Sequence, residues 1–447
     1  MKNIINSFST ISTKDQKKID FHPTKIISGR GVYVTDEFGK ELLDGMAGLW
    51  CVNIGYGREE LAEEAKKQMI DLPYYHTFYG SSLDSTEKLS EELQNLTNHE
   101  FSKFFFCNSG SESVDSAIKI AHYIWKTKGK EDKKWIISRE NSYHGSTIAA
   151  TAIGGMNKMK CQLGNHISNI AHINHPFDHS LVGKQEEEDF ARKRALKLEE
   201  KILELGPENV AAFIAEPFQG AGGVMIPHKI YWEIIPEICK KYNILLIADE
   251  VIGGFGRLGC WFSYMHFGFQ PDIFTFAKGL TSGYLPMGGV AVHKNIVNTL
   301  TNLNAQVFHH GFTYSGHPVC ASVALKNIEI LKKDKIIDHV KSISPYFKDK
   351  LKEAIETFPI IGSISSEGLV AGIQLLWDDD SMDLGSLCRE EAYNQGIIMR
   401  ASGNRLILSP PLIITKNEID TLCQRIHETL KVVTSKIFSD KKLQLRK

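Results

Sequence analysis

Residues 243–287 read NILLIADEVIGGFGRLGCWFSYMHFGFQPDIFTFAKGLTSGYLPM, and two apolar runs in this stretch each end at one charged residue. The run 244–248 ends at Asp249, and the run 273–277 ends at Lys278. Continuous apolar runs of this length predict strands that are buried on both faces, as in a parallel sheet. Open sheets of this kind bind ligands outside the carboxyl ends of their strands. We therefore expect Asp249 and Lys278 to face one ligand site.

Strands and helices alternate on the N-terminal side of this stretch, which predicts an α/β fold with a doubly wound, mostly parallel central sheet. The expected strands are 104–107, 135–138 and 210–215, and the expected helices are 58–70, 85–96, 114–125 and 185–205.

The pattern changes beyond about residue 325, where helices come before strands. Helices are expected at 322–333 and 342–357, and strands near 368–374 and 405–408. A chain of 447 residues is too long for one small core,. We expect a small domain that combines residues 1–57, with a hairpin at 31–45, and the α+β region 326–447, packed on a large domain formed by residues 58–325.

Composition excludes several classes of protein. The net charge of −1 gives no electrostatic reason to bind nucleic acid or an anionic membrane,. The eight cysteines form no C-x-x-C pair, so neither a zinc site nor a redox motif is predicted,. The first residues lack the apolar core of a signal peptide, and no stretch is long enough to cross a membrane. We expect a cytoplasmic protein without a metal.

Two groups at other strand ends suggest what the ligand is. The small residues 108–113 precede a helix, where free backbone N–H groups favour an anion such as phosphate; an ordinary turn is the alternative,. Tyr143 and His144 follow the strand at 135–138, and either could stack on a planar ring or fill a domain seam,.

The charged residues allow similar alternatives. Asp249 could hold a ring nitrogen in its protonated form through a charge-assisted hydrogen bond, or it could cap a helix or pair with Arg257,. Burial would lower the pKa of Lys278 and free its amine as a nucleophile. The alternative is a lysine that extends to the surface.

Eight stretches spread over residues 30–435 resemble one family. They are DGMAGLWCVNIGYGR, FCNSGSESVDSAIKI, YHGST, AEPFQGAGGV, ADEVIGGFGRLG, FTFAKGLTSGYLPMG, GFTYSGHPVCA and MRASGNRLILSPPL. The chain resembles the class III aminotransferases of fold type I, which depend on pyridoxal 5′-phosphate. Within that family it is most similar to the branch that transfers amino groups from amines or ω-amino acids to pyruvate.

The resemblance implies a role for each matching residue. Lys278 matches the lysine that forms a Schiff base with the cofactor, and Asp249 matches the acid on its pyridine nitrogen. The remaining matches are Val251 and Tyr143 on the two faces of the ring, Gly110 and Ser111 at the phosphate, Thr313 at the phosphate of the neighbouring subunit, Trp50, Phe78 and Tyr143 in the substrate pocket, and Arg400 on a substrate carboxylate. A homodimer, or a dimer of dimers, with shared active sites is therefore implied.

The expected reaction is a ping-pong transfer of an amino group from an amine or ω-amino acid to pyruvate or another 2-oxo acid. Ala221 stands near the place where relatives acting on ornithine or 4-aminobutyrate resemble one another in having a glutamate that pairs with the mobile arginine. A small residue also fits the diaminopelargonate-forming branch. An aminomutase or lyase on the same cofactor, and a non-catalytic binding protein, remain alternatives, and the sequence leaves the amino donor open. The stretch before Gly31 is shorter than in the family, so no residue before 30 is assigned a role.

Overall fold

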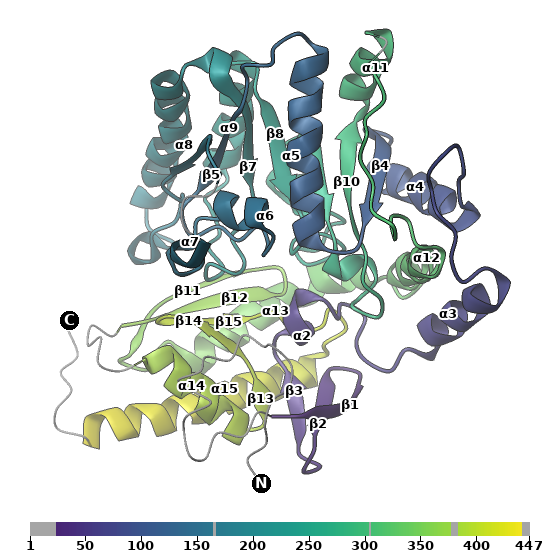
Figure 1. Cartoon of the computed structure of the whole chain (residues 1–447). Coiled ribbons are helices and arrows are strands. Elements are labelled where there is room, and N and C mark those ends of the chain that lie inside the picture. Colours follow the sequence, from purple (N-terminus) through teal and green to yellow (C-terminus); the bar gives the residue numbers. More distant parts are fainter. Residues whose placement is uncertain (1–23, 164–166, 304, 377–382, 440–447) are drawn as a thin grey trace.

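A computed structural model describes residues 24–163, 167–303, 305–376 and 383–439. Figure 1 shows an upper part built around one large sheet with helices against it, and a lower part that contains two smaller sheets. Strands 244–248 and 273–277 of the sequence prediction correspond to β8 (Leu245–Asp249) and β9 (Ile273–Phe276), at the centre of the large sheet.

The large sheet has seven strands in the order β4-β10-β9-β8-β7-β5-β6. All neighbours run parallel except β10, which is antiparallel to both β4 and β9. The other strands are β4 (Phe101–Cys107), β5 (Trp135–Arg139), β6 (Ile170–Ile173), β7 (Val210–Ala215) and β10 (Gly288–His293). The predicted α/β fold with a mostly parallel central sheet is confirmed.

Alternating residues of the central strands pack into two separate apolar cores. In β8, Ile247 belongs to one core, and Leu246 and Ala248 belong to the other. Because both faces of the strand are covered, its sequence is apolar throughout and does not alternate with polar residues. The helices of this part are α3 (Glu59–Asp71), α4 (Asp84–Leu96), α5 (Gly110–Thr127), α6 (Ile148–Ile153), α7 (Asn157–Leu163), α8 (Glu186–Leu205), α9 (Ile230–Lys241), α10 (Ser263–Phe267), α11 (Lys294–Asn302) and α12 (Pro318–Lys333), with short 3₁₀ turns at His179–Leu181, Pro207–Asn209 and Lys278–Leu280.

The lower part joins the two ends of the described chain. One sheet has the order β1-β2-β3-β13, in which Leu43 and Asp44 of β3 pair with Ile397 and Ile398 of β13. The second has the order β11-β12-β15-β14. The bounds are β1 (Ile26–Arg30), β2 (Tyr33–Asp36), β3 (Glu41–Asp44), α2 (Ala47–Trp50), α13 (Ile336–Ile355), β11 (Ile361–Glu367), β12 (Val370–Leu375), α14 (Leu384–Asn394), β13 (Ile397–Ile398), β14 (Arg400–Ser402), β15 (Arg405–Leu408) and α15 (Lys416–Ser439).

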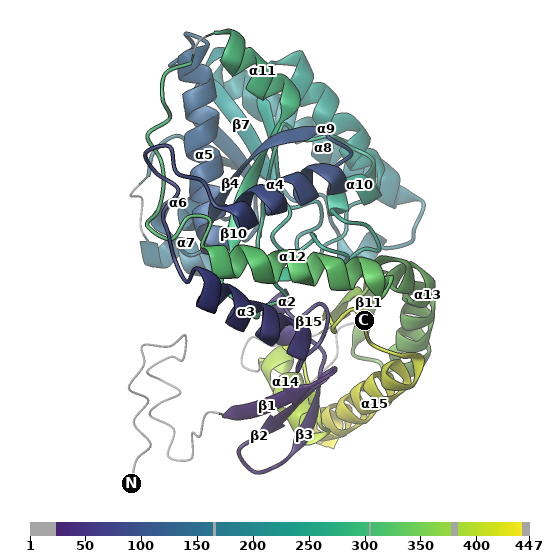
Figure 2. The same cartoon turned by 90° about the vertical axis from the view of Figure 1, so that its right-hand side faces the viewer.

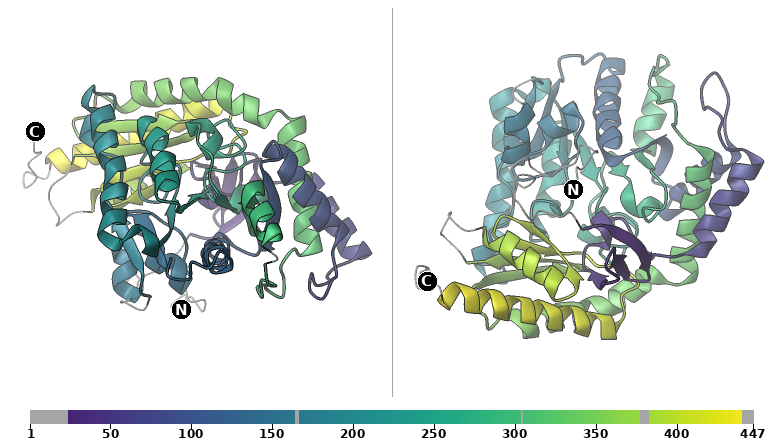
Figure 3. Two further views of the ribbon diagram at one scale, coloured as in Figure 1. Left: turned by 90° about the horizontal axis from the view of Figure 1, so that it is seen from above. Right: turned by 60° about the horizontal axis from the view of Figure 1, so that its bottom comes forward.

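Figures 2 and 3 show α15 along the outer side of this lower part. The pairing of β3 with β13 agrees with the expectation that the N-terminal hairpin packs with the C-terminal region. The domain boundaries at residues 57 and 325 stay predictions, and residues 1–23 of the first segment lie outside the described residues. Among the helices of the described ranges, none is both long and apolar enough to cross a membrane.

The start of α5 differs from the prediction. The sequence prediction placed a loop at 108–113 and began the helix at 114, whereas α5 begins at Gly110. Ser109 is the N-cap and accepts a hydrogen bond from the backbone N–H of Glu112, while the Glu112 carboxylate accepts one from the backbone N–H of Asn108. These reciprocal contacts resemble a capping box and stabilise an earlier helix start. Small residues alone had suggested a loop.

Two helix starts in the C-terminal third were also predicted too late. The expected helix 322–333 begins at Pro318, which occupies the first turn of α12, where a missing backbone N–H costs no hydrogen bond,. The expected helix 342–357 begins at Ile336 and contains Pro345.

Candidate active site

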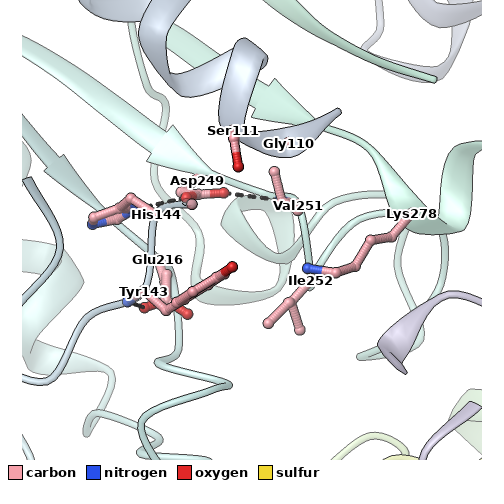
Figure 4. Close-up of a pocket in the computed structure, with 10 residues that line it drawn as sticks. Gly110, Ser111, Tyr143, His144, Glu216, Asp249, Val251, Ile252 and Lys278 are labelled. Carbon is pink, nitrogen blue, oxygen red and sulfur yellow. Dashed lines mark hydrogen bonds and ion pairs between the residues drawn. The ribbon is translucent and has the colours of Figure 1, made fainter. Parts of the chain in front are cut away.

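A pocket lies at the carboxyl ends of β7, β8 and β9 (Figure 4). Its lining residues come from five separate stretches of the chain: Gly110, Ser111, Tyr143, His144, Gly145, Glu216, Asp249, Val251, Ile252 and Lys278. The structure therefore brings together six of the ten residues to which the family resemblance gave a role. Trp50, Phe78, Thr313 and Arg400 are outside this lining.

Asp249 ends β8 and is only 4% exposed. Its Oδ2 lies 2.7 Å from His144 Nδ1, and its Oδ1 accepts hydrogen bonds from the Thr275 hydroxyl and the Val251 backbone N–H, each at 3.1 Å. The alternative pairing with Arg257 is wrong, because Arg257 binds the side chain of Asn53 and two backbone carbonyls. The helix-cap alternative is also wrong, because the next helix after β8 is α10, which begins at Ser263.

His144 is not placed to stack on a planar ring, which the sequence had left open. Its ring is buried, and both nitrogens are engaged: Nδ1 by Asp249, and Nε2 by the Ser138 hydroxyl at 3.1 Å. A carboxylate can only accept, so Nδ1 carries a proton and donates it to Asp249. Ser142 continues the network through a 3.2 Å contact with Ser138. The histidine thus fixes the orientation of the Asp249 carboxylate.

Lys278 enters the pocket from the side opposite His144 and Glu216 (Figure 4). It begins the 3₁₀ turn after β9, and its φ of 44° is uncommon for a residue with a side chain,. Such a conformation persists only where the surrounding structure enforces it, and it is typical of functional sites. Burial lowers the pKa of Lys278, whereas the fields of Cys51, Asp249 and Glu216 oppose that shift. In the described part of the chain, no hydrogen bond or ion pair occupies the amine.

The N-terminus of α5 forms another wall of the pocket, with Gly110 and Ser111 in its lining. A side chain at Gly110 would place its Cβ 2.8 Å from Val251, and one at Gly145 would lie 2.6 Å from the Ser111 hydroxyl. Only glycine leaves room at these two positions for the side chains of Val251 and Ser111,. The helix dipole and the free N–H groups of the first turn favour an anion at this end of α5.

Glu216 is a pocket residue to which the sequence prediction gave no role. It follows β7, is buried, and accepts hydrogen bonds from the backbone N–H groups of Tyr143 and Gly220, each at 3.0 Å. Burial raises its pKa, and the neighbouring field of His144 opposes that shift. The signal was available, because an acidic residue directly after an apolar strand is the same pattern that singled out Asp249.

Arg400 and Trp50 adjoin the pocket without lining it. Burial lowers the pKa of Arg400, and the fields of Tyr143 and Glu216 oppose that shift, so the guanidinium is within electrostatic reach of both pocket residues. Trp50 is 2% exposed and belongs to an apolar cluster that includes Ile252, which lines the pocket.

Thr313 and Phe78 lie in a different environment. Thr313 is exposed, and its carbonyl accepts a hydrogen bond from the Tyr74 hydroxyl at 2.8 Å. Phe78 neighbours Tyr79, with ring centroids 6.1 Å apart, in a segment of exposed aromatic side chains. Neither residue lines the pocket that contains Lys278.

Comparison with known proteins identifies the family. The family described as aminotransferase class-III matches residues 14–430. The chain belongs to the class III aminotransferases. It is therefore an aminotransferase, with the α/β fold of the pyridoxal-phosphate enzymes of fold type I.

Named relatives of this class III aminotransferase use several donors. The chain is 45% identical to the putrescine–pyruvate aminotransferase of Pseudomonas aeruginosa, over 91% of each protein. It is 39% identical to a mitochondrial γ-aminobutyrate transaminase of Oryza sativa subsp. indica, over 95% of this chain and 84% of that protein.

Solved structures of other transaminases share the fold. The (S)-enantioselective ω-transaminase of Thermomicrobium roseum superposes with a TM-score of 0.90 and 38% identity, over 96% of both chains. The ω-transaminase of Pseudomonas jessenii in complex with PMP superposes with a TM-score of 0.88 and 37% identity, over 94% of both chains.

Proposed function

We propose that this class III aminotransferase is a pyridoxal 5′-phosphate enzyme that moves an amino group from an amine or ω-amino acid to pyruvate. It would act by a ping-pong mechanism. The observation that carries the proposal is the pocket itself, which combines the enclosed amine of Lys278, the carboxylate of Asp249 and the N-terminus of α5. The relative with pyruvate in its name is the one at 45% identity.

The residues present fit this cofactor. The N-terminus of α5, with Gly110 and Ser111, would hold the phosphate. Tyr143 and Val251 would contact the two faces of the ring, and the Asp249 carboxylate would accept a hydrogen bond from the ring nitrogen,. The unpartnered amine of Lys278 would bind the cofactor covalently. When bound, pyridoxal phosphate supplies an electron sink for the carbanion formed at the donor carbon.

The protein's own groups perform the proton chemistry. The Asp249 carboxylate would face the ring nitrogen of the bound cofactor, and the N–H of His144 holds that carboxylate in place,. Lys278, once its amine is free, would take the proton from the donor carbon and deliver it to the cofactor's aldehyde-derived carbon, two bonds away across the transferred nitrogen. The lowered pKa of Lys278 suits this role, because a base works best when its pKa approaches the working pH,.

Two features bear on the substrates. Arg400 would bind the carboxylate of pyruvate, because its guanidinium lies within electrostatic reach of the pocket,. Ala221 supplies no carboxylate to neutralise that arginine, which disfavours the switch implied for ornithine and 4-aminobutyrate enzymes. Since the 45% identical relative acts on putrescine, diamines come first among the donors to be tested.

We further propose that two chains share their active sites in a homodimer, or in a dimer of dimers. Exposed aromatic side chains lie beside Thr313, namely Tyr74 at 38% and Tyr314 at 57% exposure. A second chain would cover this apolar surface, and Thr313 would reach its phosphate site.

A donor panel with pyruvate as the first acceptor, followed by other oxo acids, tests the reaction. We expect donors to bleach the visible absorbance of the bound cofactor, and pyruvate to restore it while alanine forms. An aminomutase or lyase would instead give its product without any oxo acid. Failure of every oxo acid, including the keto precursor of diaminopelargonate, to restore the absorbance would contradict a transaminase.

A further inference from the structure

The chain between α11 and α12 lies along one side of α5. Figures 1 and 2 both show this green segment descending from α11 beside α5 towards α12. It carries Gln306, Phe308 and His310 on its way to Thr313. We call residues 305–312 the strap.

Three residues on one face of α5 contact the strap. Ser116, Lys119 and Tyr123 stand on one face of the helix because residues three and four apart are neighbours there. The strap meets this face through the Gln306 carbonyl and through the Phe308 and His310 side chains. The Tyr123 hydroxyl donates to the Gln306 carbonyl, and the Tyr123 and Phe308 rings lie 4.8 Å apart. His310 then contacts both Lys119 and Ser116.

His310 uses both ring nitrogens on α5. Its Nδ1 lies 2.8 Å from Lys119 Nζ, and its Nε2 lies 2.8 Å from the Ser116 hydroxyl. An ammonium can only donate, so Nδ1 accepts and the ring is neutral, with its proton on Nε2. The Ser116 hydroxyl accepts that proton and donates in turn to the Glu112 carbonyl. Burial and the neighbouring Lys119 lower the pKa of His310, which keeps the ring neutral.

The hydrogen bonds of His310 matter because the strap runs beside an open groove and is not covered by apolar side chains along its whole length. This open groove of about 490 Å³ lies between β4, α5 and α11, and Phe308 and Ala305 of the strap line it. Towards Thr313, the rings of His310 and Phe312 pack on Phe105 of β4, with centroids 4.7 and 6.0 Å away. Ring packing is non-directional, whereas the two hydrogen bonds at the His310 ring fix the position of the strap along α5 at this point,.

We propose that His310, held by Lys119 and Ser116, is a positioning residue that sets the register of the strap and so places Thr313 for the cofactor phosphate of the partner subunit. This inference rests on the proposed function, in which Thr313 serves the neighbouring site. α5 would then serve both active sites of the dimer. Its first turn would hold the phosphate of its own subunit, and its second to fourth turns hold the strap that serves the other subunit.

A double-mutant cycle on cofactor retention tests this inference. The holoenzyme variants Thr313→Ala, His310→Ala and the double variant are dialysed, and the dissociation constant of pyridoxal phosphate is measured by absorbance. Loss of one hydrogen bond from Thr313, or of its correct position, weakens binding about fivefold to tenfold. If His310 acts through Thr313, the double variant binds the cofactor no more weakly than Thr313→Ala alone.

Three controls make the outcome specific. His310→Asn keeps an acceptor near the position of Nδ1, so it should regain part of the lost affinity. Tyr123→Phe removes the hydrogen bond to Gln306 at the far end of the strap and should leave affinity within about twofold. Light scattering confirms that each variant keeps the oligomeric state of the parent.

The outcomes separate the inference from the proposed function. Additive losses from His310→Ala and Thr313→Ala, or an unchanged affinity in His310→Ala, would overturn the role of His310 while leaving shared sites intact. An unchanged affinity in Thr313→Ala would contradict the shared sites themselves, and with them the inference.

Discussion

The pocket around Asp249 and the surface around Thr313 differ in how many of their contacts come from a single chain. At Asp249, each carboxylate oxygen has a partner from the same chain, and the side chain is 4% exposed. At Thr313, the side chain is exposed beside Tyr314, which is 57% exposed, and Tyr74, which is 38% exposed. The pocket is therefore organised within one subunit, whereas the surface requires a second one. Substitutions in the pocket should stop the chemistry, and substitutions on the surface should weaken cofactor retention.

Lys278→Ala should have the largest effect, because the same amine binds the cofactor and moves the proton. We expect transamination to fall by more than about 10⁴-fold. The measurement is alanine formation from pyruvate with the best donor of the panel. An unchanged thermal unfolding midpoint shows that the variant is folded, and substantial remaining activity would refute the role of the lysine.

Asp249→Asn should have the next largest effect, since it removes a carboxylate beside the ring nitrogen and keeps the shape of the side chain. We expect kcat to fall by about 10² to 10³-fold. His144→Phe is the matched variant, because it removes the hydrogen-bond donor and keeps both a ring and the Asp249 carboxylate, and kcat should fall about tenfold. Equal losses in the two variants would mean that the charge of Asp249 is not what matters.

Mixed dimers of Lys278→Ala and Thr313→Ala subunits test the surface. In such a dimer, the subunit that keeps Lys278 receives an intact Thr313 from its partner. One of the two sites should therefore bind the cofactor as tightly as the parent, compared with about fivefold to tenfold weaker binding in Thr313→Ala alone. If tight binding fails to return in the mixed dimer, Thr313 acts within its own chain.

The pH dependence of cofactor attachment should show the smallest effects, in opposite directions for two variants. Only the neutral amine reacts, so the attachment rate rises with pH and levels off above the lowered pKa of Lys278,. The field of Glu216 raises this pKa and that of Arg400 lowers it. Glu216→Gln should therefore move the midpoint to lower pH, and Arg400→Met should move it to higher pH. Shifts in the same direction would contradict these field effects.

The sequence predicted the pocket better than its surroundings for physical reasons. Asp249 and Lys278 follow long apolar runs, and buried strands of a parallel sheet end at one edge, so their proximity follows from the pattern. The partner of Asp249 was missed because His144 is 105 residues away along the chain and its ring could equally have stacked on a ligand. Glu216 was missed although it ends a strand in the same way. The early start of α5 depended on hydrogen bonds between Asn108, Ser109 and Glu112 that small-residue composition does not reveal.

Surface residues were less predictable still. Thr313 and Phe78 received roles only through the family resemblance, because no periodicity or charge distinguishes them in this sequence. The contact of His310 with Lys119 joins residues 191 positions apart, and neither belongs to a pattern that signals chemistry.

The central claim is that Lys278 binds the cofactor in a pocket formed by its own chain. Reduction of the purified holoenzyme with borohydride, followed by proteolysis and mass spectrometry, locates the modified residue directly. The account predicts a reduced pyridoxyl-phosphate group on the peptide that contains Lys278, and none in Lys278→Ala. A modified peptide elsewhere in the chain, or an adduct of the same yield in Lys278→Ala, would contradict it.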